Sequence, residues 1–321
     1  MAVLWDSMRY LPNSGVAALL AATVSWSLTA VFVKHFAALG IDGDTQNLFR
    51  YAAAALGLWV WVPFVFGREV ARAMTQWRIF LLPVAVNCVF QVIMVSSLYR
   101  VTIYPGFMSL LSQSAVLFTT VLAFILFREE RPTILSRRYV IGCGLALVGV
   151  AGVMLFRQGA RLDFGEGVTL ILISSFLWAG YTVSMKPVVR QVNPIVAFTV
   201  VATYTAAFFL ALALARSQPM QFFEVGFKGQ FLVVLSGVLC ISAAHSIYFV
   251  AVNKLGVAIC GSFLLIQPLL TNVLSAFVLG ERLTQSQMAS GVVLLAGAFL
   301  IVRARAAGAE TKAEPTETPE G

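Results

Sequence analysis

The sequence predicts an all-α integral membrane protein with ten transmembrane helices, arranged as two five-helix repeats of inverted topology. Of its 321 residues, 60% are hydrophobic and only 11% are charged, whereas soluble domains average about 45–50% apolar and about 25% charged residues. Apolar stretches of about 20 residues recur along the chain, and each is long enough as a helix to cross a hydrocarbon core of roughly 30 Å. One of these stretches also occurs twice.

The repeated stretch begins at Gly15 (GVAALLAATVSWSLTAVFVK) and returns 152 positions later at Gly167 (GVTLILISSFLWAGYTVSMK). Six of the twenty positions are identical: Gly15/Gly167, Val16/Val168, Leu20/Leu172, Trp26/Trp178, Val31/Val183 and Lys34/Lys186. Apolar identities arise readily by chance in membrane helices. The shared tryptophan and lysine are therefore the stronger signs of a duplication.

Ten apolar runs define the predicted spans: 14–34, 45–66, 79–99, 105–127, 139–156, 167–186, 194–215, 230–252, 257–279 and 284–302. We expect Asp44 to be the N-cap of the second span and Asn193 that of the seventh, with Pro194 at the first helical position. The fifth and tenth spans are rich in glycine and alanine, which lets helix backbones approach closely in lipid. We expect these two spans to pack outside the site, and they are the candidate interface for a homodimer.

The basic residues predict the orientation. With the N-terminus inside, fourteen Lys and Arg residues lie in inner segments and seven in outer segments, which predicts that both termini are cytoplasmic. Because five spans is an odd number, the second repeat must enter the membrane from the opposite side. The predicted units are residues 1–157 and 158–305. Residues 306–321 are small, acidic and proline-containing, and are predicted to form a disordered tail.

The sequence also excludes several functions. The net charge of +8 comes mainly from segments between apolar spans, so we expect no nucleic-acid partner. All fourteen acidic residues lie in loops, at span ends or in the tail, so no carboxylate proton relay is expected at mid-membrane depth. Motifs for a hydrolase nucleophile, a phosphate-binding loop or a metal site are lacking. The sequence therefore predicts a non-enzyme with no catalytic residue, no metal site and no cofactor.

Three segments resemble helices of one known family. The segment SWSLTAVFVK resembles the first helix of the drug/metabolite transporter superfamily, in which a lysine follows a tryptophan by eight residues. NLFRYAAAALGL resembles the second helix, with Arg50 at its arginine position, and QPLLTNVLSAFVLGERLT resembles the ninth. The chain is thus similar to EamA-type permeases with two EamA repeats, over about residues 14–303. The resemblance implies a permease for small metabolites, often an exporter, in the inner membrane.

Polar and aromatic side chains within the spans are the candidate substrate-binding residues: Trp26, Asn87, Gln91, Gln113, Trp178, Tyr181, His245, Tyr248 and Gln267. Both tryptophans lie at mid-span, where they either wall a cavity or pack as large core side chains. His245 is the one ionisable residue near the middle of a span. It is either a substrate or proton site, or a neutral histidine hydrogen-bonded to a neighbouring helix.

The amides and one proline add further candidates. Asn87 and Gln91 lie one helical turn apart and either contact a zwitterion or hydrogen-bond to other helices. On the ninth helix, Gln267 stands beside Pro268. This proline is predicted to kink the helix and to free the carbonyl of Leu264 for substrate binding or bending.

Three basic residues within or at the ends of spans are candidates for gating or structural roles. Lys34 and Lys186 lie at opposite membrane faces, and each either snorkels to the headgroups or serves a gate or a substrate carboxylate. Arg50, about six residues into its span, must face protein or water rather than lipid. We expect it first to contact carbonyls or a helix end, and second to bind an anion.

These features predict a secondary transporter in the cytoplasmic membrane. It would move small polar metabolites, amino acids among them, by alternating access, with efflux as the expected direction and with little or no proton coupling. Its partners would be the small-molecule substrate and the lipid bilayer. The alternative is a lipid-carrier flippase or an accessory membrane subunit, which would need a lateral opening to lipid.

Overall fold

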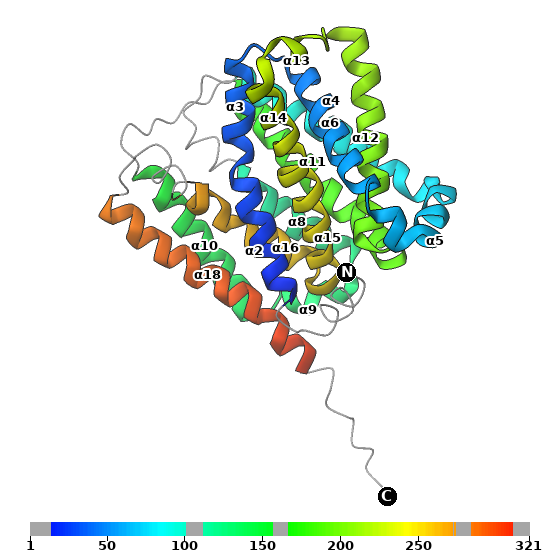
Figure 1. The fold of residues 1–321 in the computed structure, drawn as a ribbon. Helices are drawn as coiled ribbons and strands as arrows, with labels where there is room; N and C mark the ends of the chain where they lie inside the picture. The colour runs from blue at the N-terminus through cyan, green and yellow to red at the C-terminus, as the bar shows by residue number, and fades with distance from the viewer. Residues whose placement is uncertain (1–13, 101–111, 157–165, 272, 274–283, 311–321) are drawn as a thin grey trace, which may run out of the picture.

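The computed structural model describes residues 14–100, 112–156, 166–271, 273 and 284–310. Every secondary-structure element within these ranges is helical. The predicted all-α fold is confirmed. Ten helical segments follow the ten predicted spans in order, and they form the bundle shown in Figure 1.

The first repeat begins with α2 (Ser14–Ser27), which continues directly into α3 (Thr29–Ala38). The remaining spans are α4 (Gly43–Trp59) with α5 (Val62–Thr75), η1 (Trp77–Phe80) with α6 (Leu81–Arg100), α8 (Ser114–Leu126) and α10 (Arg137–Leu155). Two short elements, η2 (Arg128–Glu130) and α9 (Arg131–Ile134), lie between α8 and α10.

The second repeat begins with two long helices, α11 (Glu166–Gln191) and α12 (Pro194–Arg216). Its remaining elements are α13 (Gln221–Glu224), α14 (Gly226–Ser236), η3 (Gly237–Ala243), α15 (Ala244–Leu255), α16 (Val257–Phe263), η4 (Leu264–Ile266) and α18 (Gln285–Glu310). The segment η3 is a π-helix that joins α14 to α15 within one continuous span.

The helices have the length and composition of a multi-pass membrane protein. Five described helices are able to cross a membrane on this criterion, and seven are if each of two bent pairs counts as one span. The bent pairs are α4 with α5, at 98°, and the Arg128–Ile134 segment with α10, at 69°. Two shorter apolar helices, Ser114–Leu126 and Val257–Thr271, occupy the fourth and ninth predicted spans.

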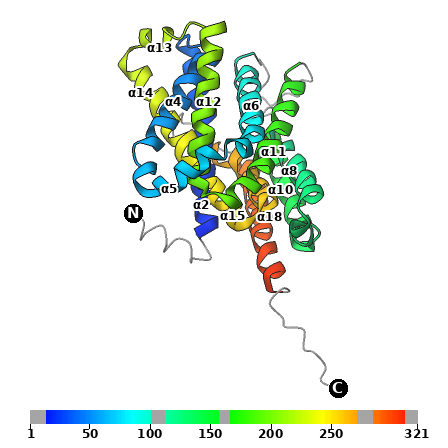
Figure 2. The same ribbon diagram turned by 90° about the vertical axis from the view of Figure 1, so that its right-hand side faces the viewer.

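Helix pairing follows the internal symmetry. In the first repeat α2 packs against α15, and its equivalent in the second repeat, α11, packs against α6 (Figures 1 and 2). The equivalent helices α4 and α12 pack against each other, as do α10 and α18. Exchange of the two repeats therefore maps these contacts onto one another, as an inverted repeat requires.

The contact between α10 and α18 depends on glycine. A Cβ atom at Gly149 would lie 2.5 Å from the backbone nitrogen of Leu294, and one at Gly297 would lie 2.5 Å from that of Ala146. These glycines therefore allow the close contact between α10 and α18 of the same chain. The predicted homodimer through the fifth and tenth spans gains no support, because a second copy would have to use the opposite faces of these helices.

Helix ends differ from the predictions in two places. The N-cap of α4 is Asp42 rather than Asp44, because the Asp42 carboxylate accepts hydrogen bonds from the backbone nitrogens of Asp44 (3.0 Å) and Thr45 (2.9 Å). The helix α18 continues to Glu310 and so includes the first five residues of the predicted tail, where its alanines favour helix. The Asn193 cap is confirmed, since its side chain accepts from Ile195 N at 2.9 Å.

The glycine contact predicts a sharp difference between two substitutions on α10. Gly149→Ala would place a methyl group against the backbone of α18 and should lower the free energy of unfolding by about 1–3 kcal/mol. Gly144→Ala is the matched control, because nothing lies within 4 Å of its Cβ position. Thermal unfolding of both variants in detergent tests this, and equal stabilities would contradict the close packing.

Candidate functional site

Five ring side chains from three helices meet inside the bundle, and we call them the aromatic cluster: Trp26, Trp178, Tyr181, His245 and Tyr248. The Trp26 and Trp178 rings are 5.1 Å apart, edge to face. Trp26 also lies 4.9 Å from both the His245 and the Tyr248 rings. All five residues were candidates from the sequence, and the two tryptophans come from equivalent positions of the two repeats.

Phenylalanines complete the surroundings of the cluster. Phe198 of α12 stacks on the imidazole of His245, with 4.8 Å between ring centroids and 11° between planes. Phe90 of α6 lies 5.3 Å from the Trp178 ring. Trp26 and His245 are buried, but Trp178 is partly exposed. The cluster therefore has a histidine held between apolar rings and one tryptophan that is not fully covered.

The π-helix η3 anchors this arrangement. The Trp26 indole Nε1 donates to the carbonyl of Cys240 at 2.9 Å, and His245 Nδ1 is 3.0 Å from the carbonyl of Ile241. Both carbonyls belong to η3, whose wider turn departs from the regular i to i−4 pattern; such π segments are frequent at functional sites. Gln267 adds a third link, because its Nε2 donates to the backbone oxygen of Trp26 at 3.3 Å.

The cluster contains buried polar atoms that have no hydrogen-bond partner within the described part of the chain. They are His245 Nε2 and the hydroxyl oxygens of Tyr181 and Tyr248. Leaving such a group unpaired costs about 1–3 kcal/mol. Apolar ring faces with unsatisfied polar atoms among them can bind a small molecule that has both apolar and polar parts.

Asn87 and Gln91 lie in a neighbouring network. The Asn87 amide nitrogen donates to the hydroxyls of Tyr51 and Thr205, each at 3.1 Å. The backbone oxygen of Gln91 accepts from Asn47 at 3.4 Å. The Asn87 side chain is thus engaged in interhelical hydrogen bonds, which is the packing alternative named above.

The remaining sequence candidates lie on the fourth and ninth spans. Gln113 is buried immediately before α8. Pro268 follows the 3₁₀ turn η4, in which the backbone N–H of Gln267 donates to the carbonyl of Leu264. The predicted free carbonyl at Leu264 is therefore wrong, because the 3₁₀ turn before the proline satisfies it.

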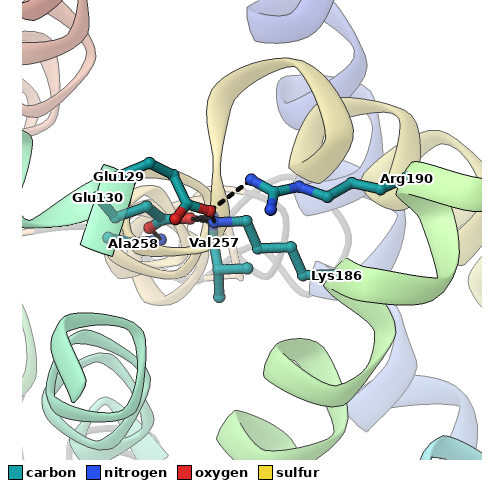
Figure 3. Close-up of polar contacts among 6 residues, drawn as sticks. All are labelled: Glu129, Glu130, Lys186, Arg190, Val257 and Ala258. Carbon is teal, nitrogen blue, oxygen red and sulfur yellow. Dashed lines mark hydrogen bonds and ion pairs between the residues drawn. The ribbon is translucent and has the colours of Figure 1, made fainter. Parts of the chain in front are cut away.

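A second polar site joins the two repeats, and we call it the latch: Glu129, Glu130, Lys186 and Arg190 (Figure 3). Lys186 makes ion pairs with Glu130 and, at 3.0 Å, with Glu129. Its side chain is 3% exposed, so Lys186 does not snorkel to the headgroups. Its ammonium also lies 3.8 Å from the centre of the Phe127 ring, at cation–π distance.

Glu130 also caps a helix. Its two carboxylate oxygens accept from the backbone nitrogens of Val257 and Ala258, both at 2.8 Å, at the start of α16 (Figure 3). Gly256 precedes them with φ of 89°, and a Cβ there would come within 3.0 Å of the carboxylate. One carboxylate thus neutralises Lys186 and satisfies two orphan N–H groups of another span.

Glu129 of the latch stays ionised over the physiological pH range. Burial alone would raise the pKa of Glu129, but hydrogen bonds from its own backbone, Lys186 and Arg190 outweigh burial and lower the pKa to about 2. A depressed carboxyl pKa contributes stability above the unfolded value, and that stability is lost only as the pH falls toward the folded value. Acidification from about pH 8 to 5 therefore does not neutralise the Glu129 carboxylate.

Sequence reasoning missed Glu130 as a site residue. Glu130 and Glu281 stand 151 positions apart, at the ends of the fourth and ninth predicted spans, which is close to the 152-position offset of the repeat. That correspondence could have identified Glu130, but its position in a predicted loop suggested solvent exposure. The side chain of Lys34, the partner of Lys186 in the repeat, and Glu281 itself lie outside the described residues.

Arg50 lies on α4 and is 1% exposed. Its Nε donates to Ser236 Oγ at 3.2 Å, and its Nη1 is buried without a hydrogen-bond partner in the described ranges. The bonded Nε thus meets a side-chain hydroxyl rather than a carbonyl.

Comparison with known proteins agrees with this architecture. The sequence profile of the EamA-like transporter family matches residues 13–155 and 165–303. An uncharacterized transporter of Haemophilus influenzae is 25% identical over 185 residues, which are 57% of this chain and 61% of that protein. A solved crystal structure superposes with a TM-score of 0.73, covering 92% of this chain and 99% of the other. At 17% identity this last similarity shows the fold alone.

The latch predicts unequal effects for its two cations. Lys186→Met would leave Glu130 buried without its counter-charge and should lower the free energy of unfolding by about 3–5 kcal/mol. Arg190→Met is the matched control, because Arg190 is 49% exposed and exposed pairs contribute at most about 1 kcal/mol. Chemical or thermal unfolding would measure both, and a Lys186 variant as stable as the control would rule out a buried ion pair.

Proposed function

The chain belongs to the EamA-like transporter family, and from that premise we propose that it exports small polar metabolites, amino acids among them, by alternating access. It is a multi-pass membrane transporter. The observation that carries the proposal is the aromatic cluster, in which equivalent tryptophans of two inverted repeats meet and lie beside rings with buried polar atoms that have no hydrogen-bond partner in the described ranges. A site shared by both repeats is the arrangement that alternating access uses.

The cluster supplies two kinds of contact. The faces of Trp26 and Trp178 offer apolar surface to the hydrocarbon part of a substrate. His245 Nε2 and the Tyr181 hydroxyl offer hydrogen bonds to a polar group. Because the two tryptophans touch in this conformation, a substrate enters when the repeats separate at one side. The contact that breaks is then replaced by contacts with the substrate.

The latch is proposed to close the cytoplasmic mouth. The surplus of basic residues on the predicted inner segments supports placing α9 and both termini in the cytoplasm of a cell whose inner membrane holds the protein. In agreement, α2 begins and α18 ends at the end of the molecule that carries α9 (Figure 1). Opening this mouth separates Lys186 from Glu130, and closing it restores their ion pair.

We propose that transport is uncoupled from protons or only weakly coupled. Apart from Glu69 in the middle of α5, the acidic groups in the described ranges lie at helix ends and connections, and the aromatic cluster there contains no carboxylate. His245 is the one titratable imidazole of the cluster and is enclosed by Phe198, Trp26 and Trp178.

Trp26→Ala and His245→Ala should each lower the initial rate of metabolite counterflow at least about tenfold, because each removes about 1.4 kcal/mol or more of substrate interaction. The assay uses the full-length protein in liposomes loaded with a cell extract, and mass spectrometry identifies the exchanged metabolites. Trp77→Ala is the matched control, since Trp77 is 46% exposed and lies outside the cluster. Unchanged flux in folded Trp26 and His245 variants would show that the cluster is not the substrate site.

Weak coupling predicts that a proton uncoupler leaves counterflow within about twofold of its starting rate, since the aromatic cluster in the described ranges contains no carboxylate that would release a proton during exchange. Flux at equal internal and external pH, with and without the uncoupler, gives the comparison. Uptake that collapses with the uncoupler and is also lost in His245→Ala would overturn this part of the proposal and make His245 a proton site.

A further inference from the structure

Arg50 is a buried cation for which the described residues supply no carboxylate partner. Its guanidinium is 1% exposed and makes no ion pair with a carboxylate in the described part of the chain. An arginine cannot escape the cost of burial by losing its proton in a protein. The positive charge of Lys186 is therefore compensated by Glu130, whereas no described carboxylate compensates the positive charge of Arg50.

The groups around Arg50 do not neutralise it. Its electrostatic neighbours are the side chains of Tyr51, Tyr99 and Cys240, which are uncharged at neutral pH. Nε is bonded to the neutral hydroxyl of Ser236, and Nη1 has no partner in the described ranges. An uncompensated buried charge costs several kcal/mol. A group that binds here and carries a negative charge would recover that cost.

Arg50 lies beside the aromatic cluster, through the same π-helix. Ser236, its hydrogen-bond partner, directly precedes η3, and Cys240 within η3 holds the indole of Trp26. Ser236 and Cys240 are four residues apart, so Arg50 and Trp26 are bonded to neighbouring turns of one helical segment. This placement suits a small metabolite with a charged head and an apolar body.

We propose that Arg50 is the anion subsite of the substrate site, and that it binds the carboxylate of a small substrate whose apolar part packs on Trp26. This inference rests on the proposed transport function and narrows its substrate class to carboxylates. A guanidinium presents paired N–H donors that match the two oxygens of a carboxylate. Nη1 of this guanidinium has no hydrogen-bond partner in the described ranges, so it is the donor that binds the carboxylate. Nε keeps its bond to Ser236.

The test uses the purified full-length protein, with benzoate as the carboxylate probe and benzamide as its neutral counterpart. Benzoate should raise the thermal unfolding midpoint of the wild-type protein in a saturable manner, and benzamide should not. Arg50→Met should weaken benzoate binding about 30-fold or more, as expected when one partner of a buried charge pair is removed. Without ligand, Arg50→Met should unfold no earlier than the wild type, because it removes an uncompensated charge.

Ser236→Ala is the matched control, since it removes the hydrogen bond of Arg50 and keeps the charge. It should retain the benzoate shift. If Arg50 is only a structural anchor, Arg50→Met and Ser236→Ala should both destabilise the empty protein and neither ligand should bind selectively. Equal shifts with benzamide, no benzoate shift in the wild type, or a benzoate shift that survives Arg50→Met would each overturn the proposal.

Chloride is the alternative anion that the experiment must distinguish from a carboxylate at Arg50. If sodium chloride stabilises the wild type but not Arg50→Met, relative to sodium gluconate, and benzoate adds nothing further, the site holds an inorganic anion and the carboxylate proposal is wrong. The counterflow assay separates this failure from failure of the transport function. If the wild-type protein exchanges metabolites without preference for carboxylates, the inference about Arg50 is wrong and the proposed transport function still holds.

Discussion

The contact between Lys186 and Glu130 is the interaction on which the closed end of this structure depends. A charge buried away from water needs a partner, and Glu130 provides it while also accepting two backbone N–H groups at the start of α16. Three spans are therefore joined at one carboxylate. Because this carboxylate comes from the first repeat and the lysine from the second, the contact couples the positions of the two halves.

The need of a buried charge for a partner also distinguishes Lys186 from Arg50, the two buried cations among the described side chains. Lys186 is neutralised within the chain, so its contact contributes to a stable conformation. In the described ranges, the Nε of Arg50 bonds to the Ser236 hydroxyl and its Nη1 has no hydrogen-bond partner. The positive charge of Arg50 is therefore available to the carboxylate of a bound substrate, as proposed above. The inverted duplication builds the aromatic cluster by bringing Trp26 and Trp178 together.

The sequence was informative where the signal was periodic or duplicated. Apolar runs predicted the helices, and the repeated tryptophan predicted two rings that do meet. It was less informative where a helix departs from regular geometry, because the apolar pattern of the eighth and ninth spans does not distinguish the π-helix η3 or the 3₁₀ turn η4 from a regular α-helix. The role of Glu130 was missed for a similar reason, since its partners Lys186 and Val257 are 56 and 127 residues away along the chain.

The distance across the latch tests the account most directly. Spin labels at Leu135 and Gln191, both exposed and on opposite sides of the latch, would report that distance by pulsed electron resonance in lipid. The account predicts two distance populations whose ratio changes when a transported metabolite is added, and a shift toward the longer distance in Lys186→Met. A single distance that neither the metabolite nor the substitution alters would contradict it.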